Sequence, residues 1–119
     1  MKKDQRVKKS QEFSKVFKEG TSFANRQFVL YVLAKEGQEQ WRVGLSVSKR
    51  VGNAVVRNRV KRLVREVFQS ATDELRPGCD YVVIARVPAK DLSYSEVRRS
   101  LFHVMRKAKV IHKPKRSSE

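Results

Sequence analysis

The sequence predicts an α+β fold in which helices pack as one layer on a small β-sheet. Some segments repeat apolar residues at a helical period, and others are rich in β-branched and aromatic residues or alternate apolar with polar residues. A length of 119 residues suits a single domain with one modest core. The predicted order is α-β-β-α-β-α, a two-layer sandwich without repeats or linkers. Residues 1–9 and 112–119 are polar and basic, and we expect them to be flexible tails.

The first predicted element is a short helix over residues 11–19. Phe13, Val16 and Phe17 recur there at helical spacing, and the two phenylalanines stand one turn apart. Ser10 precedes them and is a suitable N-cap, because its hydroxyl can accept a hydrogen bond from an unpaired backbone N–H group.

Two strands are predicted next. The first strand is predicted over residues 26–35. Its positions 28–33 are β-branched, aromatic or leucine on both faces, so both faces must be covered. Residues 36–40 are polar and contain Gly37, which predicts a hairpin turn. Residues 41–48 alternate strictly, which predicts a strand with one buried face and one polar face. The polar face carries Arg42, Ser46 and Ser48.

The second half of the chain is predicted to hold two helices and one strand. Apolar residues follow a helical period in residues 55–71 and again in residues 95–109. Between them, residues 81–86 are mostly β-branched and aromatic, which predicts a third strand closed by Pro88.

Positive charge is the dominant property of the chain. It contains 28 Lys and Arg residues against 12 Asp and Glu residues, a formal net charge of +16. A compact domain with this charge repels itself, so a polyanionic partner (DNA, RNA or an anionic surface) is expected. No run approaches the roughly 20 apolar residues of a membrane span, and no secretory signal follows the basic N-terminus. A single cysteine, Cys79, favours a reducing compartment such as the cytoplasm.

The helix predicted over residues 55–71 concentrates cations on one side. At about 100° per residue, the basic residues fall on one arc, with Arg59 at its border. The opposite arc is apolar and holds Val56, Val60, Leu63, Val64 and Val67. An ordinary solvated helix face would mix both signs of charge, with acidic and basic residues four apart. Here like charges stand four apart, which costs stability unless a polyanion binds. The predicted binding residues are Arg57, Asn58, Arg59, Lys61, Arg62 and Arg65.

The stretch from Val51 to Arg65 resembles the RNR signature of the bacterial ribonuclease P protein family, with the triplet Arg57-Asn58-Arg59 intact. The resemblance covers about residues 7–110. It implies a ribosomal-protein-like sandwich with a left-handed crossover. It also implies that the chain is the protein subunit of ribonuclease P, an endoribonuclease that removes the 5′ leader of precursor tRNA. The RNR helix would bind the RNA subunit, which performs the hydrolysis with bound Mg²⁺.

The same resemblance implies a cleft between the first helix and the sheet that holds the single-stranded leader. Aromatic side chains among cations suit this task, because bases stack on rings while cations contact phosphates. Simple core packing is the alternative role for the two phenylalanines, and the two roles can coexist. The predicted cleft residues are Phe13, Phe17, Tyr31, Lys49 and Arg50.

No residues suited to hydrolytic chemistry stand out. The sequence shows no close carboxylate pair, no His–acid pair and no metal-ligand spacing, so we predict neither catalytic nor metal-binding residues in the protein. Glu66 and Asp80 are isolated and are expected to have surface or capping roles, whereas Cys79 is expected to pack. Magnesium is expected mainly on the RNA subunit, and the protein alone is expected to be a monomer. The alternative function is that of a ribosomal-type structural RNA-binding protein.

Overall fold

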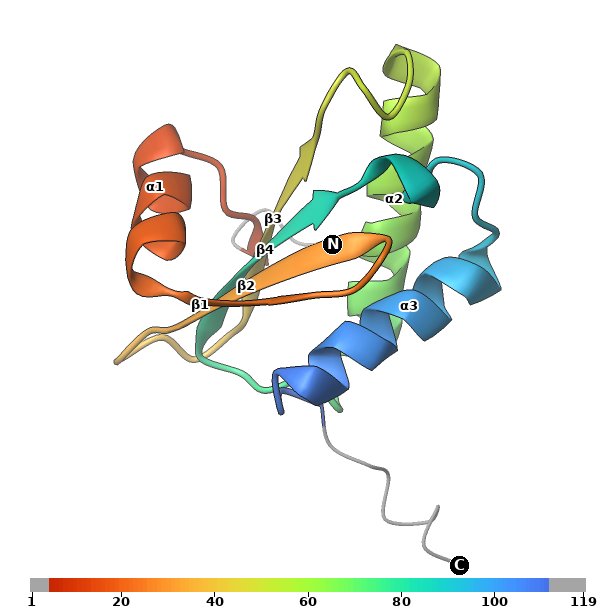
Figure 1. Cartoon of the computed structure of the whole chain (residues 1–119). Helices are drawn as coiled ribbons and strands as arrows, with labels where there is room; N and C mark the ends of the chain where they lie inside the picture. The colour runs from red at the N-terminus through yellow and green to blue at the C-terminus, as the bar shows by residue number, and fades with distance from the viewer. Residues whose placement is uncertain (1–4, 112–119) are drawn as a thin grey trace, which may run out of the picture.

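The computed structural model describes residues 5–111, which form three α-helices, four strands and a short 3₁₀ helix around one sheet (Figure 1). The predicted tail segments 1–4 and 112–119 lie outside the described residues. The elements in chain order are α1 (Ser10–Glu19), β1 (Thr21–Ala24), β2 (Phe28–Ala34), β3 (Arg42–Val47), α2 (Ala54–Ser70), β4 (Cys79–Ala85), η2 (Val87–Ala89) and α3 (Tyr94–Lys107).

The sheet has the order β1-β2-β4-β3, with β4 between β2 and β3. The β1–β2 and β2–β4 pairs are antiparallel, and the β3–β4 pair is parallel. The prediction that β2 and β3 form a hairpin is therefore wrong. The chain does turn at Gly37, whose φ is 81°, but it then passes to the far side of β4. The parallel connection β3–α2–β4 is the crossover to which the left-handed expectation applies.

The predicted α-β-β-α-β-α order misses one strand, β1. This strand is only four residues long, and three of them are exposed. Thr21 to Ala24 pair with residues 29–32 of β2, so their place in the sheet depends on backbone hydrogen bonds with a neighbouring strand. Such a short exposed strand has no periodicity for the sequence to reveal.

Helices cover both faces of the sheet (Figure 1). α2 and α3 pack on the face that carries the main core, which includes Phe28, Leu30 and Tyr81. α1 packs against β2 and β4 on the other face, where Val16 and Val82 are fully buried. The prediction that both faces of β2 are covered is thus confirmed for the face of Phe28 and Leu30, whereas the face of Val29 and Tyr31 is covered only in part. The two-layer description fits the main core, and α1 adds cover on the second face.

Residues 5–9 are part of the fold, contrary to the prediction of a loose tail. Val7 is 5% exposed, and its N–H group donates to the carbonyl oxygen of Val43 at 3.0 Å. Arg6 and Val43 form a parallel bridge, so this segment runs along the free edge of β3. The alternation of Arg6 and Lys8 around a buried valine is the sequence pattern that indicates such a strand-like segment.

The helix starts are fixed by side chains that accept backbone hydrogen bonds. At α2 the Asn53 side chain accepts from the N–H group of Val56 at 3.0 Å, as an N-cap does. Ser10, the predicted cap of α1, is instead the first helical residue, and Lys9 occupies the capping position. Glu12 compensates, because its carboxylate accepts the N–H group of Lys9 at 3.2 Å.

A buried ion-pair cluster joins α1 to the sheet. Asp80 is 1% exposed and receives two hydrogen bonds from the Arg42 guanidinium, at 2.8 and 2.7 Å. A third nitrogen of Arg42 donates to Glu12 on α1 at 2.9 Å, and Lys35 adds a contact to Asp80 at 3.3 Å. The predicted surface or capping role of Asp80 is therefore wrong. The pairing partners come from different strands, which the sequence alone does not align.

Candidate RNA-binding site

The aromatic residues predicted for the cleft meet where α1 crosses the sheet. Strand register places Tyr31 and Gly44 on either side of Val82 in one row of the sheet. The Phe17 and Tyr31 rings meet edge to face, with centroids 4.9 Å apart. A Cβ atom on Gly44 would lie 2.6 Å from Phe13, so the Phe13 ring rests on the glycine backbone. The fold therefore brings all three predicted rings into one cluster.

The exposure of these rings fits both roles left open by the sequence. Phe17 is 40% exposed, and Phe13 and Tyr31 are half-buried, whereas Val16 between the phenylalanines is fully buried. Val16 thus anchors the helix, and the phenylalanines pack together while keeping part of their surface open. A half-open ring can contact a base without unfolding its surroundings.

The sheet face stays open beyond the aromatic cluster. In the next row Ser46 is exposed, and Ile84 and Val29 are half-buried. Lys49 and Arg50 follow the end of β3 in the same direction, and both are exposed. This open strip therefore has rings at one end and cations at the other, although Lys49 and Arg50 are not in the ring cluster itself.

The structure confirms the two faces predicted for α2. Val60, Leu63, Val64 and Val67 are buried, and the cationic positions are exposed or half-buried. Two of the six predicted binding residues also hold the protein together. The Arg57 guanidinium donates to the Gly52 carbonyl at 3.2 Å, and Arg59 donates to the Leu92 carbonyl at 2.9 Å.

The other predicted residues of α2 differ in their surroundings. Asn58 is exposed, and the Arg62 side chain is 64% exposed and lies 3.7 Å from Glu66, which has the predicted surface role. Such an exposed pair contributes little to stability. Lys61 and Arg65 are half-buried and form no ion pair with any residue between 5 and 111. They are therefore available to an external anion.

Arg65 faces another cation, Arg6 of the N-terminal segment. Burial and the positive charge of Arg6 together lower the pKa of Arg65 from its ordinary value. The guanidinium remains charged at neutral pH, because the ordinary value is so high. Arg6 was assigned to the loose tail in the sequence interpretation, so it is a residue of this surface that the prediction missed.

A hollow of about 330 Å³ connects the aromatic cluster to α2. Phe13 and Gly44 line one end, and Lys61 and Arg65 line the other. The two surfaces that the sequence predicted separately are therefore adjacent. Together they form one basic and aromatic surface, which we call the α1–α2 surface and define by the cleft residues, the α2 cations and Arg6.

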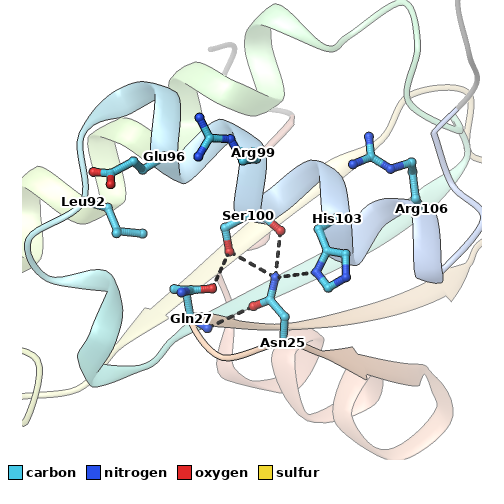
Figure 2. A pocket seen from close by; sticks show the side chains of 8 residues that line it. All are labelled: Asn25, Gln27, Leu92, Glu96, Arg99, Ser100, His103 and Arg106. Carbon is cyan, nitrogen blue, oxygen red and sulfur yellow. Dashed lines mark hydrogen bonds between the residues drawn. The ribbon is translucent and has the colours of Figure 1, made fainter.

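A second hollow, of about 410 Å³, lies between α3 and the turn before β2 (Figure 2). Asn25 lines this hollow, and its amide donates to Ser100 at 2.8 and 3.0 Å and lies 3.3 Å from the His103 ring. Gln27 accepts from the Ser100 hydroxyl at 3.0 Å. None of the predicted site residues lines this hollow, and its central polar groups satisfy one another.

Potential metal ligands do not gather into a site in the part of the chain that the structure describes. Between residues 5 and 111 no three His, Cys, Asp or Glu side chains cluster in a way that could hold a metal ion. Cys79 is fully buried, which confirms its packing role. In the same part of the chain, no helix has the length and apolar character needed to cross a bilayer.

A small mixed sheet with a cationic helix beside an open aromatic strip defines a single-domain RNA-binding protein. Comparison with known proteins gives the particular family. The family model described as Ribonuclease P matches residues 1–109, and the chain belongs to the ribonuclease P protein family.

Relatives and solved structures of the same family agree with this assignment. The ribonuclease P protein component of Shouchella clausii is 71% identical over 111 residues, covering 93% of this chain and 91% of the relative. A 2.0 Å structure of the Staphylococcus aureus RNase P protein has a TM-score of 0.85 and 44% identity, and covers 91% of this chain and 98% of that chain. The RNase P protein of Thermotoga maritima, solved with 1-(4-fluorophenyl)-2-thiourea, has a TM-score of 0.79 and 32% identity, and covers 86% of this chain and 98% of that chain.

Proposed function

We propose that this chain is the protein component of a ribonuclease P holoenzyme and that its α1–α2 surface binds RNA. In this role α2 contacts the RNA subunit, and the aromatic strip between α1 and the sheet holds the 5′ leader of precursor tRNA. The observation that carries the proposal is that the cationic face of α2 lies next to an open aromatic cluster in a member of this family. On that face Lys61 and Arg65 form no ion pair with any residue between 5 and 111. Cations bind phosphates without regard to sequence, and rings stack on any base.

Hydrolysis in this proposal belongs to the RNA subunit and its magnesium ions. The described residues do not fit a metal site, because residues 5–111 contain no cluster of potential ligands. The protein's contribution is binding and positioning, which lowers the cost of bringing two polyanions together. We further propose that the protein alone is a monomer and acts in the cytoplasm.

Reconstitution tests the proposed function. Mixed with a bacterial RNase P RNA, the protein is expected to stimulate 5′ cleavage of precursor tRNA at low magnesium, because its cations offset repulsion between the two RNAs. The measurement is the cleavage rate across a magnesium titration with and without protein. A lack of stimulation at every magnesium concentration would contradict the proposal and favour the structural RNA-binding alternative.

The leader-binding role of the aromatic cluster predicts a selective defect for Phe17→Ala. The holoenzyme should lose about tenfold in affinity for precursor tRNA, because stacking on an aromatic ring contributes roughly 1–3 kcal/mol per base. Affinity for mature tRNA, which lacks the leader, should stay the same. Phe102→Ala is the control, since Phe102 is a half-buried ring on α3, outside the cluster. An equal loss for both tRNAs would remove the leader assignment.

A further inference from the structure

The hollow between α3 and the turn before β2 has a volume of about 410 Å³, which is within the range of small-molecule binding sites (Figure 2). Two arginines of α3, Arg99 and Arg106, line it together with His103 of the same helix. Both arginines are exposed, and neither forms an ion pair within the part of the chain that the structure describes. One acidic residue, Glu96, also lines the hollow. The hollow is therefore cationic, and none of its lining residues belongs to the α1–α2 surface.

A frame of hydrogen bonds gives this hollow its shape without a ligand. The Asn25 side-chain carbonyl accepts from the N–H groups of Gln27 and Phe28 at 3.0 and 2.8 Å. The Asn25 amide nitrogen donates to Ser100, and the Ser100 hydroxyl donates to the side-chain carbonyl of Gln27 at 3.0 Å. These bonds join the turn before β2 to α3. A ligand therefore does not have to order this wall when it binds.

The frame also determines which groups remain for a ligand. Because the Asn25 carbonyl is bonded to the backbone, its NH₂ group is the one that lies 3.3 Å from His103, and the Nδ1 atom of His103 accepts. The imidazole hydrogen is then on Nε2, from which it can be donated to a ligand. The Gln27 carbonyl is used within the frame, which leaves the Gln27 NH₂ group. These groups and the two arginines are all donors, so the complementary ligand is an anion rich in acceptors.

The spacing of the two arginines favours a chain of phosphates over a single carboxylate. Arg99 and Arg106 are seven residues apart, about 10 Å along the helix, so they align with two anionic groups more readily than with one. Each guanidinium can donate two parallel hydrogen bonds to the oxygens of one phosphate. His103 lies between the arginines in sequence on the same helix and adds a donor to this row.

The opposite end of the hollow has a different chemistry (Figure 2). Leu92 is half-buried and provides an apolar surface. One carboxylate oxygen of Glu96 accepts the N–H group of Ser93 at 2.9 Å, and the second oxygen can accept from a ligand. A nucleoside combines the apolar face of its base with hydroxyl and amino donors. It is therefore complementary to this end, as phosphates are to the other.

We propose that this hollow binds a nucleotide, with its phosphates on Arg99, His103 and Arg106 and its nucleoside toward Leu92 and Glu96. Free nucleotides and the nucleotides of an RNA strand carry the same groups, so the source is determined by experiment. The site goes beyond the proposed function and does not depend on it, because its residues are separate from those to which RNA-subunit and leader binding are assigned.

NMR spectra of the full chain test the site, with ADP as the probe. ADP should shift the side-chain NH₂ resonances of Asn25 and Gln27, which report on this hollow and not on α2, where anions also bind. Adenosine, which lacks phosphates, and pyrophosphate, which lacks the nucleoside, should each bind at least about tenfold more weakly, because each loses one end of the site. The nucleotide site is overturned if ADP causes no shift up to about 10 mM, or if either fragment binds as tightly as ADP.

The double substitution Arg99→Gln and Arg106→Gln should weaken ADP binding at these resonances by about a hundredfold, with about tenfold from each charge-assisted contact. Arg76→Gln is the matched control, because Arg76 is an exposed arginine that does not line the hollow. Circular dichroism checks that the double variant is folded, and Arg106→Gln alone replaces it if it is not. Equal ADP affinities for the variant used and the Arg76 control would contradict the proposal.

A short oligoadenylate without terminal phosphates distinguishes the two sources. Tighter binding of the oligonucleotide than of ADP at the same resonances would identify a segment of RNA as the ligand, and weaker binding would identify a free nucleotide. Either result supports a nucleotide site. Stimulation of precursor-tRNA cleavage by wild type is measured separately, so a failure of ADP to bind would leave the proposed function intact.

Discussion

Replacing Asp80 with alanine is expected to lower the free energy of unfolding by about 3 kcal/mol, because removal of one partner leaves buried charge uncompensated. The Asp80 carboxylate is 1% exposed and pairs with Arg42 and Lys35, whose side chains are 20% and 26% exposed. These partners remain partly exposed to solvent, and Arg42 keeps its hydrogen bond to Glu12. The expected loss of unfolding free energy is therefore at the lower end of the range for a broken buried ion pair.

Urea unfolding followed by tryptophan fluorescence measures this effect. Trp41 is the single tryptophan, is 2% exposed and packs on Phe68 with ring centroids 5.7 Å apart, so it reports loss of the core. Asp91→Ala is the control, because Asp91 is exposed and is expected to change stability by less than about 0.5 kcal/mol. Equal midpoints for the two variants would show that the buried cluster is not stabilising.

The same carboxylate gives the effect a defined pH dependence. Burial raises the pKa of Asp80, but hydrogen bonds from Arg42 and Gln38 and the charges of Arg42 and Lys35 outweigh burial and hold the pKa below its ordinary value. A lowered pKa in the folded state means that the stabilisation is fully present above the ordinary value of about 4. It is lost as the pH falls through the folded value. The difference between wild type and Asp80→Ala should therefore be constant near neutral pH and shrink in acid.

The cluster also links stability to the RNA-binding surface. Arg42 bonds Asp80 of β4 and Glu12 of α1 at the same time, so it ties the helix that carries Phe13 and Phe17 to the sheet. The sequence interpretation placed Arg42 on the polar face of its strand and treated Asp80 as an isolated residue with a surface or capping role. Their pairing across parallel strands depends on β3 lying beside β4, which local patterns do not contain.

The sequence predicted correctly those features that depend on residues close together in the chain. The two faces of α2, for example, follow from the spacing of its residues alone. The strand order failed because a turn at Gly37 specifies a change of direction but not which strand the chain then joins. Pairing of strands distant in sequence depends on tertiary packing. The turn was therefore predicted correctly, but the pairing of the two strands that flank it was not.

In the candidate site, too, residues with a local sequence pattern were predicted and a residue placed by tertiary contacts was missed. The ring cluster and the α2 cations were predicted because aromatic and basic residues recur at recognisable spacings and match a family signature. Arg6 was missed because its place on this surface depends on tertiary contacts. It pairs with the edge of β3 and lies near Arg65. A basic residue near a chain end has the same appearance in sequence whether it is solvated or enclosed.

The double substitution Arg57→Ala and Arg65→Ala is expected to weaken binding to RNase P RNA by about a hundredfold at low salt, with about tenfold from each charge-assisted contact. The two residues stand eight apart on α2, about 12 Å along the helix, so their effects should add. Each lost phosphate contact should also reduce the slope of log affinity against log salt by about 1, because fewer counterions are released. Binding isotherms at several salt concentrations measure both quantities.

Arg76→Ala is the control for this experiment, because Arg76 is an exposed arginine that is not part of the α1–α2 surface. It should leave the salt slope unchanged. The stability of the double variant separates binding from folding: Arg65→Ala removes repulsion with Arg6, whereas Arg57→Ala removes one hydrogen bond to Gly52. The net change in unfolding free energy should therefore stay within about 1 kcal/mol. A normal salt slope in a folded double variant would mean that this face of α2 points away from the RNA.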